Sequence, residues 1–345
     1  MTGEGPGEFD LIARLVEVVE EARRCGSAEA GSATLGAHVL VGSGDDAAVT
    51  APPGVTATSV DAFVEGVHFR RDAASLESIG RKAMAAALSD LAAMGAAPGE
   101  AYVQLGCPPD LDDDEGLELA AGLGRAAAAA GVAVIGGDVT RAPILVVALT
   151  VVGHAGAAGD LVSRSGAEPG DVVTVTGELG GAAAGLLLLE RRELARTLAE
   201  DLAKGLRRRQ LEPSPRLAAG QALAASGATA MIDVSDGLGG DARHLASSSA
   251  VGLVIDLESL LVQAGVDEVA AVAEVDRWDL VTAGGEDYEL LATLPPGRVS
   301  GARSAVEAAG TTLTVIGRVT QGGGVSLRHA DGSLREPSGF DQLRP

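Results

Sequence analysis

The sequence has few of the features that mark secreted, membrane or disulfide-bonded proteins. It contains only two cysteines, Cys25 and Cys107, and they form neither a CxxC pair nor a metal-binding spacing. We expect both to be free thiols, as in a reducing compartment. No apolar run reaches about 18 residues without a charge or a glycine, so no membrane-spanning helix is predicted. The first residues are acidic, unlike the basic start of a secretory signal, so a cytoplasmic protein is expected.

Basic and aromatic residues are also scarce. Lysine occurs only at positions 82 and 204, and the formal net charge is −22. This charge argues against a nucleic-acid partner, whose phosphates require clustered Lys and Arg. It does not exclude a phosphorylated small molecule, because bound cations can invert the local charge. Aromatic residues make up 2% of the chain, so the core must be built from Ala, Val and Leu.

The length of 345 residues and the hydrophobic pattern predict two domains with an α/β (α+β) architecture. We place the boundary in the irregular stretch 153–169, which gives domains 1–153 and 154–345. Strands are predicted over 39–41, 47–49, 55–60, 102–105, 132–135, 145–152, 172–176, 230–234, 253–257, 288–294 and 312–319. Helices are predicted over 9–19, 76–94, 115–130, 182–190, 193–208, 216–225 and 238–248. The nearly continuous apolar run 144–152 also predicts a strand face covered by a second subunit, hence a homodimer through the N-terminal half.

Five short motifs place aspartates where the chain is expected to turn, at residues 44–46, 59–61, 89–90, 136–138 and 233–237. One such motif alone is explained by the preference of Asp for turns and helix N-caps. Several of these motifs, however, follow short apolar strands, where open α/β sheets place their ligands. Carboxylates that converge there repel one another unless divalent cations intervene, and Mg²⁺ prefers such oxygen ligands together with substrate phosphates.

Asp90 is the most informative member of this set. In the predicted helix 76–94 it lies among Ala and Met residues, while the polar side of the helix is predicted near Lys82 and Ser89. An ionised carboxylate on an apolar face is costly unless it is paired. Because Lys82 is rotated away from it by roughly 80°, a metal ion is the better partner.

Three other kinds of site are disfavoured. Residues 41–47 have the GxGxxA spacing of a dinucleotide-binding turn, but Pro52, Pro53 and a further strand pattern follow instead of the required helix. Neither lysine has the glycine and Ser/Thr neighbours of a P-loop, so an ATP site must be of another kind. The five histidines show no paired spacing, so the sequence predicts no zinc site.

Taken in order, the motifs resemble those of the thiamine-monophosphate kinase family. This family belongs to the superfamily of aminoimidazole ribonucleotide synthetase, selenophosphate synthetase and the hydrogenase-maturation dehydratase. The resemblance covers residues 7–12, 44–47, 61–69, 82–95, 135–141, 164–167, 213–216, 232–238 and 284–290. Val-His-Phe at 67–69 and Gly-Gly-Glu-Asp-Tyr-Glu-Leu at 284–290 favour the kinase over its sister enzymes.

The resemblance implies transfer of the γ-phosphate of ATP to thiamine monophosphate, with several Mg²⁺ ions as cofactors. It implies an N-terminal sheet that forms a barrel across a homodimer, and a C-terminal α/β domain over the cleft that holds ATP and Mg²⁺. The implied metal ligands are Asp46, Ser59, Asp61, Asp90, Asp138, Asp233 and Asp236. Nucleotide-contacting positions match Gly137, Asp138, Arg164 and Ser235, and positions near the thiamine moiety match His68, Glu286 and Phe340. No dedicated catalytic base is implied, because the acceptor is itself a phosphate oxygen.

Two other functions remain open at this point. The first is a sister reaction, either ATP-driven ring closure or selenophosphate formation. The latter is disfavoured because it requires a reactive N-terminal Cys or selenocysteine beside a Lys, and Cys25 has no Lys nearby. The second is a non-catalytic nucleotide-binding protein, which could dispense with metal ligands. Here the main motif carboxylates are all present.

Overall fold

The computed structural model describes residues 8–30, 38–43 and 47–340, with only the backbone given for 8–10 and 26–30. The chain divides into two compact units. Unit 1 comprises Met1–Leu91 and Ala97–Ala157, and unit 2 comprises Ala92–Ala96 and Ala158–Pro345. Both units mix strands and helices, which confirms the predicted fold class. Within the described ranges, no helix has both the length and the apolar character that a membrane span needs.

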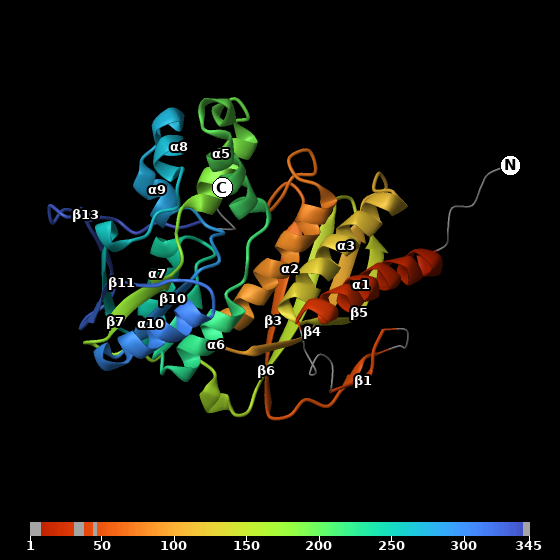
Figure 1. Ribbon diagram of the computed structural model, residues 1–345, viewed down its shortest axis with the longest axis horizontal. Helices are drawn as coiled ribbons and strands as arrows, with labels where there is room; N and C mark the ends of the chain where they lie inside the picture. The colour runs from red at the N-terminus through yellow and green to blue at the C-terminus, as the bar shows by residue number, and fades with distance from the viewer. Residues whose placement is uncertain (1–7, 31–37, 44–46, 341–345) are drawn as a thin grey trace. The chain divides into compact units, whose positions relative to one another are not determined.

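Unit 1 is a four-stranded sheet with helices on one face (Figure 1). The strand order is β3 (Val55–Val64), β6 (Val146–Ala155), β4 (Ala97–Cys107) and β5 (Ala133–Arg141), and a separate small sheet pairs β1 (Val39–Val41) with β2 (Val49–Thr50). The helices are α1 (Glu8–Ala30), α2 (Leu76–Ala93) and α3 (Asp113–Ala130). Glycines let α2 and α3 pack closely, since a Cβ at Gly80 would lie 2.3 Å from the carbonyl oxygen of Leu119.

Unit 2 is built on a seven-stranded mixed sheet, in the order β13-β12-β9-β11-β7-β10-β8. Its strands are β7 (Val172–Thr176), β8 (Ala230–Asp233), β9 (Gly252–Asp256), β10 (Leu290–Leu294), β11 (Leu313–Thr320), β12 (Gly324–Arg328) and β13 (Leu334–Arg335). Its α-helices are α4 (Gly181–Glu190), α5 (Glu200–Leu211), α6 (Leu217–Ala225), α7 (Leu238–Ser249), α8 (Val266–Ala273), α9 (Arg277–Thr282) and α10 (Val299–Ala308). The core between sheet and helices is aliphatic, as the composition predicted, and includes Val173, Val175, Ile232 and Leu291.

Most predicted elements are confirmed to within a few residues, although β4 begins five residues before and β5 ends six residues after its predicted bounds. Asp61 and Asp138, which were predicted to follow strands, therefore lie within β3 and β5. Two helix predictions were also wrong. The helix predicted over 9–19 extends to Ala30 as α1, so Cys25 lies within it. The helix predicted over 193–208 is split into a 3₁₀ turn, η2 (Leu194–Thr197), and α5. The split occurs because Leu198 adopts an extended backbone and packs on the core of unit 2. Both cysteines are free thiols, as expected.

Candidate functional site

In unit 1 the structure brings Ser59 and Asp90 together. Ser59 lies on β3, and its hydroxyl donates a hydrogen bond to Oδ2 of Asp90 on α2. The polar side of α2 was predicted wrongly, because Lys82 and Ser89 are buried, at 4% and 0% exposed, whereas Asp90 is partly exposed. Since α2 is buried on several sides, the spacing of its apolar residues does not identify the side that meets solvent.

Asp61 lies on the same face of β3 as Ser59. It is two residues further along the strand, and it pairs in register with Leu149 of β6, which is buried on the helix-covered face. Its Oδ1 accepts a hydrogen bond of 2.9 Å from the backbone N–H of Ala62. Ser59, Asp61 and Asp90 therefore present oxygen atoms on one face of unit 1.

Asp138 does not join this group within a single chain. Asp138 on β5 pairs with Gln104 of β4. Gln104 pairs in turn with Ala148 of β6, and Ala148 pairs with Ala62 of β3, so Asp138 and Ala62 lie on the same face of the sheet. Successive residues of a strand point to opposite faces, so Asp138 projects from the face opposite to that of Asp61. Three strand spacings also separate the two aspartates by about 14 Å. One copy of unit 1 therefore cannot hold a single metal ion with both carboxylates.

The remaining predicted residues of unit 1 are placed as follows. Gly137 precedes Asp138 on β5, and a Cβ there would lie 2.2 Å from the carbonyl oxygen of Val103. His68 follows β3, and its Nδ1 accepts a hydrogen bond of 3.1 Å from the N–H of Val64, so a neutral ring carries its proton on Nε2. Asp46 lies outside the described residues.

In unit 2 three carboxylates gather at the turn between β8 and α7, which we call the acidic turn (Asp233, Ser235, Asp236 and Asp241). Asp233 is the last residue of β8, and Asp241 lies in the first turn of α7. Oδ2 of Asp241 accepts hydrogen bonds of 3.1 Å from the backbone N–H groups of both Ser235 and Asp236. Gly237 has a φ of 102°, which gives the backbone the sharp change of direction that starts α7.

The electrostatics of the acidic turn fit a bound cation. Burial, together with the negative charges of Asp233 and Asp236, raises the pKa of Asp241 to about 8. Asp233 and Asp241 are 3% and 2% exposed. Buried carboxylates that raise one another's pKa become more favourable when a divalent cation lies among them. Since the side-chain donors are all oxygens, the residues fit Mg²⁺. Sequence reasoning missed Asp241, although an acidic residue in the first turn of a predicted apolar helix was a usable signal.

Glu286 and Phe340 both reach the acidic turn through their backbones. The N–H of Glu286 donates to the carbonyl of Ser235 at 2.8 Å, and the N–H of Phe340 donates to the carbonyl of Asp236 at 2.8 Å. Glu286 has a φ of 69°, and its carboxylate accepts a hydrogen bond of 2.5 Å from Nε2 of Gln210 on α5. The side chain of Phe340 is 56% exposed. The structure thus brings these two predicted substrate residues to the same turn as Ser235 and Asp236.

A buried ion network supports this arrangement and was not predicted from the sequence. Glu289 is 0% exposed and accepts hydrogen bonds from Arg209 on α5 and from both Nε and Nη2 of Arg216 at 2.8 and 2.6 Å. Burial raises the pKa of Glu289, but the two guanidinium groups outweigh it and lower the pKa. Asp287 accepts from the N–H groups of Gly180 and Ala182 at the start of α4. Burial raises the pKa of Asp287 to about 6, against the effect of Arg209.

Arg164 lies further from the acidic turn than the other predicted residues of unit 2. Its backbone carbonyl accepts a hydrogen bond of 3.1 Å from the hydroxyl of Ser249, at the C-terminal end of α7, whereas the acidic turn is at the N-terminal end. The carbonyl oxygen of Ser163, the residue before it, accepts a hydrogen bond of 2.9 Å from the backbone N–H of Met231 on β8. The Arg164 side chain is exposed.

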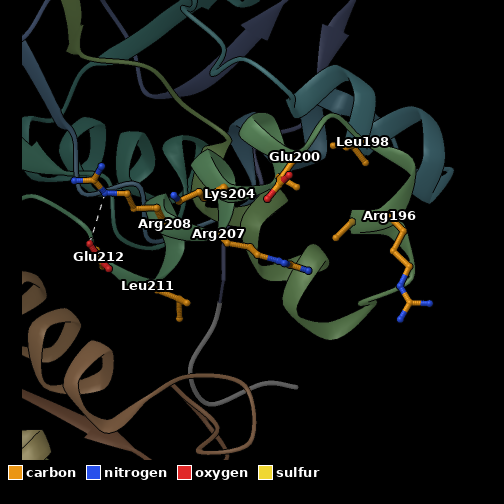
Figure 2. A pocket seen from close by; sticks show the side chains of 10 residues that line it. Arg196, Leu198, Glu200, Lys204, Arg207, Arg208, Leu211 and Glu212 are labelled. Atoms are coloured by element: carbon orange, nitrogen blue, oxygen red, sulfur yellow. Dashed lines mark ion pairs between the residues drawn. The ribbon is translucent and has the colours of Figure 1, made fainter.

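A pocket of about 600 Å³ opens beside η2 and α5 and holds none of the predicted site residues. Figure 2 shows its charged lining, which includes Arg196, Lys204, Arg207, Arg208 and Glu212. Acidic side chains offset part of the positive charge, since Arg208 pairs with Glu212 at 3.6 Å. We therefore do not assign the substrate to this pocket.

Comparison with known proteins places this geometry in a family. Residues 44–155 match the protein family described as "AIR synthase related protein, N-terminal domain". Residues 168–330 match the family of the corresponding C-terminal domain. The thiamine-monophosphate kinase of Mycobacterium tuberculosis (strain H37Rv) is 39% identical over 290 residues, which cover 83% of this chain and 80% of the relative. The chain belongs to the thiamine-monophosphate kinase family.

Solved structures of the thiamine-monophosphate kinase family share the fold. The enzyme from Stenotrophomonas maltophilia K279a superposes with a TM-score of 0.79 at 34% identity, covering 92% of this chain and 97% of that one. AaThiL complexed with AMPPCP and TMP gives a TM-score of 0.73 at 28% identity, covering 99% of each chain. The family assignment made from the motifs is confirmed.

Proposed function

We propose that this protein transfers the γ-phosphate of ATP to thiamine monophosphate, giving thiamine diphosphate and ADP. The observation that carries the proposal is the acidic turn, in a chain whose curated relatives are thiamine-monophosphate kinases. The AaThiL complex supports the same pair of substrates, because AMPPCP is an ATP analogue. Two free thiols fit a reducing compartment, so we place the enzyme in the cytoplasm.

The residues divide into groups with separate tasks. Phosphoryl transfer depends on positioning and charge neutralisation more than on covalent help from the protein. When bound, Mg²⁺ neutralises the negative charge of the phosphates. Its proposed ligands are Asp46, Ser59, Asp61, Asp90, Asp138, Asp233 and Asp236. No side chain is required as a base, because the acceptor oxygen of a phosphate is already nucleophilic.

Substrate contacts are assigned within each unit separately in this proposal. Gly137, Asp138, Ser235 and Arg164 contact the nucleotide, and the exposed guanidinium of Arg164 can donate two parallel hydrogen bonds to a phosphate. Glu286 and Phe340 are held at the acidic turn by their backbone hydrogen bonds. The exposed ring of Phe340 can stack on a cationic thiazolium ring. We assign the thiamine moiety to these two residues and His68.

The activity is tested by incubating the purified chain with ATP, Mg²⁺ and thiamine monophosphate and separating the products. We expect equal amounts of thiamine diphosphate and ADP. Asp236→Asn should lower turnover by orders of magnitude, and Asp201→Asn, an exposed aspartate on α5, should leave it unchanged. Release of ADP without thiamine diphosphate would indicate a sister reaction. Nucleotide binding without turnover would indicate a non-catalytic protein.

We further propose that the active form is a homodimer whose N-terminal sheets face one another as a barrel. Val60 on the edge strand β3 is 70% exposed and lies on the same face as Asp138. A second copy packed against this face would cover Val60. It would also place side chains of the second copy near Asp138, which lies apart from the other proposed ligands of unit 1 in its own chain. Sedimentation should show a dimer at micromolar concentration that Val60→Asp weakens, and a stable wild-type monomer contradicts the proposal.

A further inference from the structure

A second group of ligand-type side chains lies in unit 1, apart from every residue used above. His38 precedes β1, Glu100 lies on β4 and His154 lies on β6. Nε2 of His38 is 2.9 Å from Oε2 of Glu100, and Nε2 of His154 is 2.7 Å from the same oxygen. One potential ligand atom from each of the three residues lies within 4.8 Å of the others. Two imidazole nitrogens and a carboxylate oxygen thus converge on one point.

The backbone is shaped to allow this convergence. A β-bulge interrupts the pairing of β4 with β6 between Pro98 and Glu100. The extra residue is Gly99, and a Cβ there would lie only 2.3 Å from Nε2 of His154. Any other residue at this position would push the imidazole ring away from Glu100. Bulges commonly re-aim side chains at functional sites in this manner.

The charges of the group favour a cation at its centre. The Glu100 side chain is only 3% exposed, and those of His38 and His154 are 14% and 11% exposed. Burying a carboxylate is costly unless positive charge compensates it. A neutral imidazole supplies a hydrogen bond but no net charge, whereas a divalent cation supplies both charge and ligand bonds.

We propose that His38, Glu100 and His154 form a Zn²⁺ site, with water as the fourth ligand. Two His and one Glu are an established zinc-ligand set. Tetrahedral ligands about 2.0–2.1 Å from Zn²⁺ lie roughly 3.3 Å apart, so the two N···O distances of 2.9 and 2.7 Å need to open by about 0.4 and 0.6 Å. Mg²⁺ is a poor competitor, because two of the three donors are nitrogen atoms.

The site would fix the base of the β1–β2 hairpin to the main sheet. Between His38 and residues 44–46 there are only the three residues of β1, followed by Gly42 and Ser43. Zinc at His38 would therefore restrain the segment that leads into the predicted Gly-Asp-Asp motif. We expect Zn²⁺ to act as a structural ion here, bound independently of nucleotide.

The test uses the full chain freed of metal by chelation, then dialysed against buffer with Mg²⁺ and titrated with Zn²⁺. We expect one Zn²⁺ per chain and a rise in melting temperature. Glu100→Gln and His154→Ala should each weaken Zn²⁺ binding more than about tenfold, the loss typical even of outer-shell changes. His329→Gln is the matched control. Nδ1 of His329 lies 3.7 Å from Oε1 of Glu258, but this histidine is not part of the three-residue group, so its removal should leave Zn²⁺ binding unchanged.

A second measurement does not depend on variants folding. Co²⁺ added to the metal-free wild-type chain should give the visible absorption bands of a tetrahedral site, and Zn²⁺ should abolish them. Either the absence of these bands or Zn²⁺ binding equal in wild type and Glu100→Gln would overturn the proposal. The three residues would then be a hydrogen-bonded cluster only. Because neither readout involves turnover, failure here leaves the proposed kinase activity untouched.

Discussion

Asp241 makes the metal-free protein sensitive to pH in a direction that can be calculated. Its pKa is raised to about 8 in the folded state by burial and by Asp233 and Asp236, against an ordinary value of 3.8. Below about pH 4 the carboxyl group is protonated in both the folded and the unfolded state, so it does not lower the free energy of unfolding. Between about pH 4 and pH 8 the unfolded chain releases this proton while the folded chain retains it, so stability falls as pH rises. Above about pH 8 the loss is complete.

Asp241→Asn should therefore stabilise the metal-free protein at neutral pH. Each pH unit between the two pKa values is worth about 1.4 kcal/mol, so the interval from 3.8 to pH 7 represents about 4 kcal/mol. The Asn side chain keeps one oxygen to accept from Ser235 and Asp236, but its amide replaces the second oxygen. We therefore expect a net gain of about 2 kcal/mol or more.

Urea unfolding in the presence of EDTA measures this gain at a series of pH values. Trp278 is the single tryptophan and lies in unit 2, so its fluorescence reports on the unit that contains Asp241. The stabilisation by Asp241→Asn should be about 3 kcal/mol smaller at pH 4.5 than at pH 7 and should grow steadily between the two. Mg²⁺ should raise the stability of the wild type more than that of the variant. The exposed Asp201→Asn serves as control and should change stability by less than about 0.5 kcal/mol at every pH.

A gain that is independent of pH would refute this reasoning, since it would have to come from packing and not from the carboxyl group. Loss of stability at pH 7 would also refute it. In that case the ionised Asp241 would be stabilised by its two backbone hydrogen bonds more than it is destabilised by its neighbours.

Three further variants test other parts of the site. Asp138→Asn should lower thiamine diphosphate formation by orders of magnitude while the protein stays folded; near-normal turnover would exclude Asp138 as a metal ligand. Glu289→Gln leaves Arg209 and Arg216 without their shared carboxylate and should cost about 3 kcal/mol or more in urea unfolding. A cost below about 1 kcal/mol would contradict the importance of that network. Phe340→Ala should raise the KM for thiamine monophosphate several-fold and leave the KM for ATP unchanged, whereas equal changes would exclude stacking on the acceptor.

Local signals in the sequence predicted the elements well where residue chemistry alone fixes them. The helix predicted over 115–130 begins at Asp113 because Asp112 caps it, and the Asp112 N–H donates a hydrogen bond to the Glu115 carboxylate. Gly131, with a φ of 75°, ends the same helix. Strand β7 has the predicted bounds, since five β-branched residues in a row favour a buried strand.

Features that depend on distant contacts were not accessible in this way. His38 and His154 are 116 positions apart, so no sequence spacing could indicate that their rings lie 4.4 Å apart. The sequence therefore predicted no zinc site. The pairing of β4 with β6 brings His154 to Glu100, and His38 reaches the same carboxylate from the residue before β1. The buried network at Glu289 was missed for the same reason, because Arg209 on α5 and Arg216 just before α6 lie 80 and 73 positions from Glu289.

The placement of Asp138 shows most clearly what strand register adds to a motif. Sequence resemblance puts Asp61 and Asp138 in one list of metal ligands, and nothing in the sequence separates them. The register across β3, β6, β4 and β5 assigns them to opposite faces of one sheet, three strands apart. If both aspartates serve the same reaction, Asp138 must act apart from the group formed by Ser59, Asp61 and Asp90 of its own chain. In the proposed dimer it acts on the face that the second copy covers. Dimerisation and turnover should then be lost together in Val60→Asp, even though Val60 binds no substrate in this proposal.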